Sequence, residues 1–204
     1  MLREALPLFA TPVCIFDLKI SDSYQKKLQK ILVNLDYRLI RNGKGCISDE
    51  LYLFNFKEFK ILNDTILDCF HYFHENVMQY QKNKLKITTS WATKCEQRQE
   101  SVRHKHTNNL YSAVYYNQCP KGHSNITFYN NNYAPTGYEL ECEDYNFYNS
   151  GNYSVIPRDK SLVVFPANLY HKIQPNLTDK TRYSIACNAQ PTPPYGIGDS
   201  IIVD

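Results

Sequence analysis

Hydrophobic and polar positions follow a helical period in the first part of the chain. The segment 21–36, "SDSYQKKLQKILVNLD", opens with a Ser/Asp cap and places Leu28, Ile31, Leu32 and Leu35 on one face. A face of this kind buries its apolar stripe against a core and leaves its lysines and glutamines in water. The spacing predicts an amphipathic helix.

A second helix is predicted over residues 63–81, "NDTILDCFHYFHENVMQYQ", with Asn63 or Asp64 as its N-cap. His71 and His74 lie three positions apart on this helix. A pair at this spacing can bind a metal, but no third ligand lies nearby in the sequence, so packing or surface roles are favoured. The apolar stripe consists of Ile66, Phe70, Phe73 and Val77.

From residue 85 the pattern changes to alternation and to β-branched or aromatic residues, which are typical of strands. Pro, Gly and Asn separate the short runs that follow. The predicted strands are "LKITTSWATKCEQ", "NLYSAVYYN", "SNITFYN", "NYSVIP", "KSLVVFP", "HKIQP" and "RYSIACNAQ", and an opening strand is predicted within "FATPVCIFDLKI". Two helices followed by strands with no helices between them indicate an α+β chain, mainly β, built on an antiparallel sandwich or barrel.

The chain shows no linker, repeat or low-complexity tract that would divide it. We therefore expect one domain over 1–204, with a helical N-terminal part (about 1–84) and a strand-rich core (about 85–190). One connection, 131–151, is unusually long, polar, aromatic and acidic. Connections of that length in a compact domain are lids or binding loops, or plain surface loops, and both interpretations stay open.

Composition narrows the classes of protein. The chain has 204 residues, of which 43% are hydrophobic and 21% charged, as in ordinary globular proteins. Its net charge of +3, without a run of basic residues, argues against nucleic acid as a partner. No stretch approaches the roughly 18 apolar residues of a membrane span. Arg3, Glu4, Pro7 and Pro12 interrupt the N-terminal segment, which argues against a signal peptide. The seven scattered cysteines contain no CxxC, and this favours a reducing cytoplasm over a disulfide framework or zinc ribbon.

Two histidines stand close together in "RHKHTNNLYSAVYYN", residues 103–117. Because alternate side chains of an extended segment share a face, His104 and His106 can present two imidazoles to one point. They are either neighbours by chance at a strand edge or two ligands of one metal. A third histidine, His171, follows one predicted strand and begins the next, and a rolled sandwich can return it to the first pair.

An arginine and a serine complete this pattern. Arg182 opens the last strong strand, "RYSIACNAQ", eleven residues after His171, and Ser184 lies on the same face. A guanidinium can bind both oxygens of a carboxylate, and a neighbouring hydroxyl can add a further hydrogen bond. Two other residues are predicted to be structural: Trp91 as a core residue of its strand, and His123 as a solvated turn residue.

These motifs resemble those of Fe(II)/2-oxoglutarate-dependent oxygenases. "HKHTNNLYSAVYY", "LVVFPANLYHKIQPN" and "RYSIACN" are similar to members common in phages and marine bacteria, which read H-x-H-P-x-S/T, S-G-V-Y-Y, F-P-S-x-L-x-H-x-V and R-x-S-I-x-F-N. The resemblance to prolyl hydroxylases is more distant. The similarity to the oxygenases covers roughly residues 86–190, and the first 85 residues match only in general layout.

The resemblance implies a double-stranded β-helix, or jelly roll, with the N-terminal helices packed on one sheet. It implies Fe(II) as the metal and 2-oxoglutarate as the co-substrate. The implied metal ligands are His104, His106 and His171. The implied residues for the distal carboxylate of 2-oxoglutarate are Arg182 and Ser184, joined by Tyr116 through the analogy with prolyl hydroxylases.

The chain departs from the commonest pattern of this superfamily at His106, where most members have an aspartate or glutamate. Either the third imidazole binds the metal, or only His104 and His171 bind and a nearby carboxylate or water completes the site. His106 is therefore the weakest of the three expected ligands. Thr107 and Ala113 replace a proline and a glycine of the phage-type motif, and neither position is a ligand.

The implied function is that of a dioxygenase, which uses O2 and converts 2-oxoglutarate to succinate while hydroxylating a peptide or protein side chain or a small molecule. A phage-encoded protein would act in its host's cytoplasm. One alternative is a three-histidine, cupin-like metalloenzyme that does not use 2-oxoglutarate; Arg182 and Ser184 count against it. The other is a non-enzymatic jelly-roll module, which has no need of these histidines and this arginine together.

Overall fold

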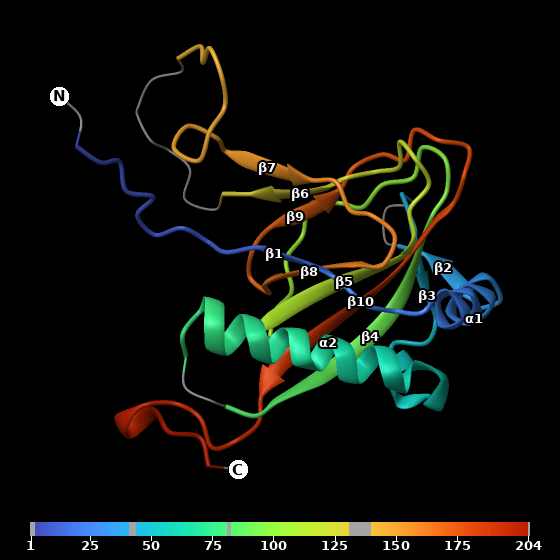
Figure 1. Ribbon diagram of the computed structural model, residues 1–204, viewed down its shortest axis with the longest axis horizontal. Coiled ribbons are helices and arrows are strands. Elements are labelled where there is room, and N and C mark those ends of the chain that lie inside the picture. The colour runs from blue at the N-terminus through green and yellow to red at the C-terminus, as the bar shows by residue number, and fades with distance from the viewer. Residues whose placement is uncertain (1–2, 41–43, 81–82, 131–139, 204) are drawn as a thin grey trace.

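The computed structural model describes residues 3–40, 44–80, 83–130 and 140–203, and its strands form two antiparallel sheets (Figure 1). The larger sheet has the order β1 (Cys14–Asp17), β8 (Ser161–Pro166), β5 (Tyr111–Gln118), β10 (Arg182–Pro191), β4 (Leu85–Cys95), β3 (Cys46–Ser48) and β2 (Tyr37–Leu39). The smaller sheet has the order β7 (Asn152–Val155), β6 (Ile126–Tyr129) and β9 (His171–Ile173).

The two sheets pack against each other through apolar side chains. Val114 and Phe165 of the larger sheet share a buried cluster with Ile126, Phe128 and Val155 of the smaller one. Side chains alternate between the faces of a strand, so this cluster defines the inner face of the larger sheet. The arrangement confirms the predicted jelly roll of mainly β structure.

Two helices cover the outer face of the larger sheet. Helix α1 (Asp22–Val33) starts at the predicted cap, where the Ser21 hydroxyl accepts a hydrogen bond of 3.2 Å from the Tyr24 amide. Helix α2 (Lys60–Tyr72) lies in front of β4 and β10 in Figure 1. Both bury their apolar stripes; Leu28 and Leu32 of α1 are 0% exposed. Truncating a leucine buried in this way costs about 2–5 kcal/mol.

Helix α2 begins earlier than predicted, and the proposed caps Asn63 and Asp64 are wrong. Two short 3-10 turns, η1 (Leu53–Asn55) and η2 (Lys57–Phe59), lead directly into the helix. Phe59 already has helical backbone angles, so the chain continues into α2 without a side-chain cap. The helix ends in a π-turn, η3 (Phe73–Val77), and residue 81 of the predicted span lies outside the described residues.

The seven strands predicted after residue 85 are all present, and the opening strand is β1. Strands β2 and β3 were not predicted. They add a short hairpin to the β4 edge of the larger sheet, where Cys46 and Ile47 pair with Lys94 and Thr93. The C-terminal part adds a 3-10 turn, η4 (Gly198–Ser200).

His74 has the packing role predicted for it. It is 3% exposed, and its Nδ1 lies 2.8 Å from the Tyr111 hydroxyl between α2 and the outer face of the sheet. His71 lies 3.8 Å from Glu75 on the same helix. Neither histidine faces the inner side of the sandwich, where His104, His106 and His171 cluster.

The long connection predicted as a lid or loop, 131–151, lies partly outside the described residues, which omit 131–139. Its second half forms turns held by their own hydrogen bonds, such as that from the Asn146 amide to the Asn149 side chain at 2.7 Å. Across the described residues, no helix has the length and apolarity that a bilayer crossing demands.

Candidate metal centre and anion pocket

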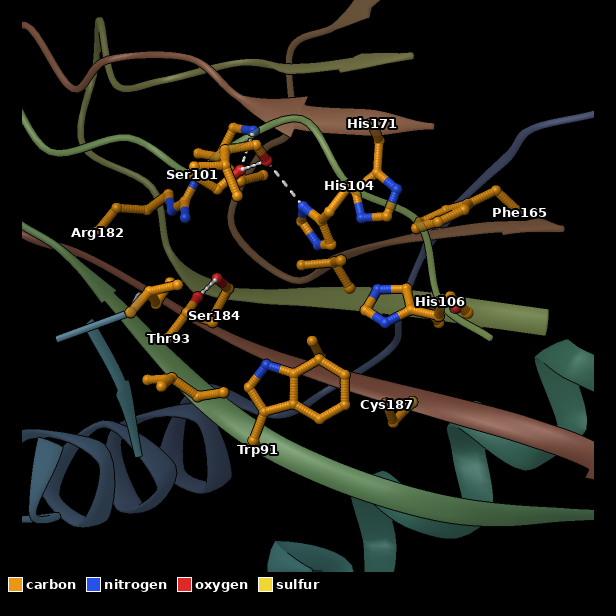
Figure 2. A pocket seen from close by; sticks show the side chains of 18 of the residues that line it. Trp91, Thr93, Ser101, His104, His106, Phe165, His171, Arg182, Ser184 and Cys187 are labelled. Carbon is orange, nitrogen blue, oxygen red and sulfur yellow. Dashed lines mark hydrogen bonds between the residues drawn. The ribbon is translucent and has the colours of Figure 1, made fainter. Parts of the chain in front are cut away.

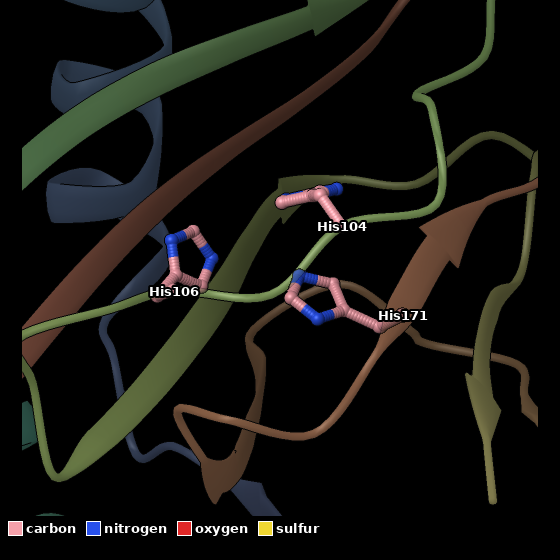
Figure 3. Close-up of side chains that lie close together, drawn as sticks. All are labelled: His104, His106 and His171. Atoms are coloured by element: carbon pink, nitrogen blue, oxygen red, sulfur yellow. The ribbon is translucent and has the colours of Figure 1, made fainter. Parts of the chain in front are cut away.

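His104, His106 and His171 meet at one end of the sandwich, with one ring nitrogen from each within 4.8 Å of the others. Figure 3 shows the three rings converging, two from the segment before β5 and one from the start of β9. The centroids of the His104 and His171 rings lie 4.3 Å apart, and each lies 5.2 Å from that of His106.

Backbone hydrogen bonds hold the two chain segments together. His104 and His171 exchange amide-to-carbonyl bonds of 2.9 and 2.8 Å, and the His106 amide donates to the Ala167 carbonyl at 2.8 Å. The segment around His104 is thus extended, as the sequence suggested, and carries a single β-bridge ahead of β5. The two-residue spacing still directs both imidazoles to the same side.

Local hydrogen bonds orient two of the rings. Nδ1 of His104 lies 2.8 Å from the Val102 carbonyl oxygen, and Nδ1 of His171 lies 3.0 Å from that of Leu169. A carbonyl can only accept, so Nδ1 carries the hydrogen in each ring and the Nε2 lone pair remains available. This is the arrangement that metal-binding histidines use to fix their tautomer.

Burial keeps two of the three rings, those of His106 and His171, neutral. Burial, with a smaller contribution from the neighbouring His104, lowers the pKa of His171 to about 3 and that of His106 to about 4. Both rings are therefore uncharged near neutral pH, which is the form that binds a metal. Among the described residues the cluster contains three imidazoles and no carboxylate. Imidazole is a suitable ligand for Fe, Zn, Cu and Ni, so the donor set fits a divalent iron.

A cavity of about 470 Å³ extends from the histidines across the inner face of the larger sheet (Figure 2). The strand registers order this face into four cross-strand rows. The first row is Cys95 and Arg182, and the second is Thr93, Ser184 and Tyr116. The third row is Trp91, Ala186 and Val114, and the fourth is Thr89, Asn188, Ser112 and Phe165.

Arg182 is buried on this face at 1% exposure. Its Nη1 donates to the Ser124 hydroxyl at 3.1 Å, and its guanidinium carbon lies 5.5 Å from the centroid of the Tyr116 ring. Within the described parts of the chain no carboxylate pairs with it, and the Arg182 Nε and the Tyr116 hydroxyl are buried without a hydrogen-bond partner.

A buried cation and two unpaired polar atoms are costly unless a ligand satisfies them. Ser184 lies one row away, 0% exposed, with its hydroxyl 2.6 Å from that of Thr93. Its oxygen can accept from Thr93 while its hydrogen is donated to a ligand. Guanidinium, phenol and hydroxyl groups are donors of the kind that can bind a carboxylate.

Five of the six predicted residues line one cavity, and the sixth, Tyr116, is fully buried with its ring beside the Arg182 guanidinium. Four neighbours were not predicted. Trp91, assigned to the core, lines the cavity with its ring 5.6 Å from that of His106, and in Figure 2 its indole nitrogen points toward the cavity. Thr93 supports Ser184, Ser124 supports Arg182, and Phe165 lies 4.8 Å from the His171 ring. His123 also differs from expectation, because it is half-buried and bonds the Pro157 carbonyl at 3.0 Å.

The comparison with known proteins found a match to the model of one family. Residues 89–188 match the model of the family described as "Putative 2OG-Fe(II) oxygenase". That segment contains the three clustered histidines together with Arg182, Ser184 and Tyr116. No curated protein sequence matches the chain significantly.

Solved structures share the fold at low sequence identity. A prolyl-4-hydroxylase from Pseudomonas putida is similar with a TM-score of 0.63 and 10% identity, covering 91% of this chain and 96% of that one. HygX from Streptomyces hygroscopicus, solved with nickel, 2-oxoglutarate and hygromycin B, gives 0.62 and 14%, covering 89% and 84%. A prolyl hydroxylase from Trichoplax adhaerens, in complex with a hypoxia-inducible-factor peptide fragment, gives 0.60 and 11%, covering 87% and 83%.

Proposed function

We propose that this chain, which belongs to the 2OG-Fe(II) oxygenase superfamily, is a dioxygenase that hydroxylates a peptide or protein side chain or a small molecule. The family match confirms the predicted family and its cofactor pair, Fe(II) and 2-oxoglutarate. The resemblance to the members found in phages and marine bacteria stays a prediction. The reaction and the role of each residue are our proposal.

His104, His106 and His171 would hold the iron. Three neutral imidazoles fit a divalent ion, and the Nδ1 bonds of His104 and His171 leave Nε2 free to bind it. This assignment makes His106 a ligand in the place of the usual carboxylate. The site would then keep the full positive charge of Fe(II), which favours an anionic co-substrate beside it.

Arg182, Ser184 and Tyr116 would hold the distal carboxylate of 2-oxoglutarate. The observation that carries the proposal is the unpaired Arg182: a buried guanidinium with an unsatisfied Nε, next to an unsatisfied Tyr116 hydroxyl. The anion would lie between these donors and the histidines, an arrangement that suits a dicarboxylic keto acid. Iron held by these residues would supply the oxidation in which O2 converts 2-oxoglutarate to succinate and CO2 and places its second oxygen atom in a C–H bond of the substrate.

The chain's own residues orient the co-substrate and exclude water. The third row, with Trp91 and Val114, lies beside the histidines and presents a largely apolar surface there, which disfavours ordered solvent. Arg182 is fixed by Ser124, and Ser184 by Thr93, so neither needs to reorganise on binding. Preorganised donors of this kind bind an anion at small entropic cost.

The test is calorimetric titration of 2-oxoglutarate into the anaerobic, metal-loaded protein, comparing wild type with Arg182→Ala. Losing the charged partner should weaken binding by roughly a hundredfold or more, because an uncompensated buried charge costs about 3–5 kcal/mol. Arg182→Lys should recover only part of the affinity, since an ammonium lacks the planar fork. Arg158→Ala, at an exposed arginine outside the cavity, is the matched control.

Metal binding without 2-oxoglutarate binding would overturn the proposal. The three-histidine metalloenzyme that does not use 2-oxoglutarate would then be the better account of the site. Binding of neither metal nor keto acid would favour a non-enzymatic module.

A further inference from the structure

The third row of the inner face carries one polar side-chain atom, the indole nitrogen of Trp91. The other members of the row, Ala186 and Val114, are apolar and line the same cavity. The Trp91 ring lies 5.6 Å from that of His106, and its nitrogen points toward the cavity in Figure 2. An indole N–H donates a hydrogen bond and cannot accept one. The third row therefore offers one side-chain donor, next to the histidines.

The Trp91 N–H is unpaired within the described parts of the chain. The described side-chain atoms that are both unpaired and fully enclosed are the Tyr116 hydroxyl and the Arg182 Nε, and the indole nitrogen is not one of them. It is therefore open to the cavity that Trp91 lines. Because the indole N–H of a buried tryptophan usually has an acceptor, a bound ligand is the acceptor that this arrangement leaves room for.

The hydroxyl groups that line the cavity already have partners among the described residues. Ser101 and Ser112 each donate to a neighbouring oxygen, at 3.1 and 2.7 Å. The hydroxyls of Thr93 and Ser184 lie 2.6 Å apart, and both belong to the second row. Beside the histidines, Trp91 is thus the described lining residue with a donor available for a ligand.

The spacing between the rows suits a short dicarboxylate. The guanidinium of Arg182 reaches the second row, where its carbon lies 5.5 Å from the centroid of the Tyr116 ring. Ser184 in the second row and Ala186 in the third are two positions apart on β10, which separates the rows by about 7 Å. A dicarboxylate whose far end is bound by Arg182 therefore extends over the third row toward the histidines.

The keto acid has its second carboxylate at this near end, bonded to the keto carbon. Placing a carboxylate in a largely apolar cavity is costly unless donors or a cation satisfy its oxygens. Part of that demand is met by an ion at the histidines, and the rest requires an N–H or O–H group. Over the third row, the side-chain group of this kind is the Trp91 N–H.

We propose that Trp91 is a binding residue for 2-oxoglutarate and donates its indole N–H to the carboxylate next to the keto group. This inference rests on the proposed function and deepens it. Arg182, Ser184 and Tyr116 would bind the far end of the co-substrate, and Trp91 binds the near end. Donors at both ends of the cavity favour a keto acid that is also a dicarboxylate over a keto acid with an apolar tail.

The experiment follows the indole N–H signal of Zn(II)-loaded, 15N-labelled protein. Trp91 is the only tryptophan, so the signal needs no assignment. The probes are 2-oxoglutarate and 2-oxopentanoate, which share the keto-acid end and differ at the far end. We expect both to move the indole proton downfield in a saturable way, as a hydrogen bond to a carboxylate does. 2-Oxopentanoate should need a much higher concentration, because it has no carboxylate for Arg182.

Trp91→Phe keeps an aromatic ring in the third row and removes the N–H. It should weaken the binding of both keto acids by roughly tenfold or more, measured by calorimetry. Arg182→Ala should weaken the binding of 2-oxoglutarate and leave that of 2-oxopentanoate nearly unchanged. Val114→Ala, in the same row as Trp91, removes apolar surface and no donor, so it should change both affinities far less than Trp91→Phe does.

An indole signal that saturating 2-oxoglutarate does not move, or equal affinities of wild type and Trp91→Phe, would overturn the inference. The wild-type signal decides the matter even where Trp91→Phe does not fold. A loss confined to 2-oxoglutarate in Trp91→Phe would place the donor at the far end and overturn the inference as well.

Failure of the proposed function has a different signature. If wild type binds Zn(II) and neither keto acid, the proposed co-substrate and the role of Trp91 both fail. If 2-oxoglutarate binds in a manner that depends on Arg182 while the indole signal stays in place, only the assignment of Trp91 fails.

Discussion

Tyr116 and Arg182 each carry a buried polar atom without a hydrogen-bond partner, and the guanidinium carbon of Arg182 lies 5.5 Å from the centroid of the Tyr116 ring. Burial also raises the pKa of Tyr116, so its hydroxyl stays protonated and remains a donor. Two neighbouring donors without acceptors destabilise the folded protein when no ligand is bound. They stabilise the protein only when a bound ligand accepts hydrogen bonds from both of them.

Tyr116→Phe should therefore affect stability and binding in opposite directions. Removing a buried, unpaired hydroxyl should leave the unliganded protein as stable as wild type or up to about 1–3 kcal/mol more stable, measured by urea denaturation. The same change should weaken 2-oxoglutarate binding by about 1.5–3 kcal/mol, one hydrogen bond to a charged group. Tyr115→Phe, on the opposite face of β5, is the control and should leave the affinity unchanged. Lower stability together with unchanged affinity would contradict this account.

Substitutions of the histidines should separate their roles. His171→Ala should abolish binding of Fe(II), measured by metal analysis after anaerobic loading, because two imidazoles hold a labile divalent ion too weakly. His106→Asp should retain metal, since it restores the carboxylate of the commonest pattern. His123→Ala, at a histidine outside the cavity, should bind metal like wild type. Full metal content in His171→Ala would show that the site is misplaced.

Trp91 should report metal binding by its fluorescence. It is the only tryptophan, and its ring lies 5.6 Å from that of His106. Ni(II) or Co(II) bound at the histidines should quench its emission strongly with a saturable, 1:1 dependence, whereas Zn(II), which has a filled d shell, should quench it far less. His171→Ala should remove the saturable quenching. Equal quenching by Ni(II) in that variant would place the ion elsewhere.

Stability of the metal-free protein should fall with pH below about 6.5. The folded-state pKa values of His171 and His106 are lowered to about 3 and about 4, mainly by burial, so the unfolded chain binds protons first. Stability is therefore full above the unfolded pKa and is lost as the pH falls toward the folded values. Each histidine contributes a slope of up to about 1.4 kcal/mol per pH unit.

Urea denaturation between pH 7 and pH 5, where most carboxylates remain charged, measures this slope. His106→Asn and His171→Asn should each reduce it, because asparagine does not titrate. Metal should stabilise the protein most near neutral pH, since it binds the deprotonated rings. A slope that neither variant changes would assign the pH dependence to other groups.

Much of the fold was predictable because local patterns and tertiary packing agree. The Ser21 cap and the apolar stripe of α1 specify a helix in the sequence itself, and the alternation in β4 and β10 specifies strands. Strands β2 and β3 have only three residues each, too few for a period to show. The start of α2 was missed because preceding 3-10 turns replace the usual cap.

The site was predictable where residue type is distinctive, as with three histidines and an arginine. Trp91, Thr93 and Ser124 were missed because their roles depend on which strands are neighbours. Thr93 meets Ser184 only because β4 pairs with β10, and Ser124 reaches Arg182 across 58 positions of sequence. Which residues pair between strands distant in the sequence is decided by the packing of the sandwich, and a single sequence does not reveal this register.

Strand β10 carries Arg182, Ser184 and Asn188 on one face, at even spacings. A strand rises about 3.3 Å per residue, so the backbone positions of Arg182 and Asn188 are separated by about 20 Å. Strand β10 fixes this separation, because it is hydrogen-bonded to a neighbouring strand on each side and is already extended. Deleting one residue between Ser184 and Asn188 would move the side chains on one side of the deletion to the opposite face of the sheet. Retargeting such a protein to longer or shorter molecules should therefore proceed through loops and side chains, while the length of β10 stays constant.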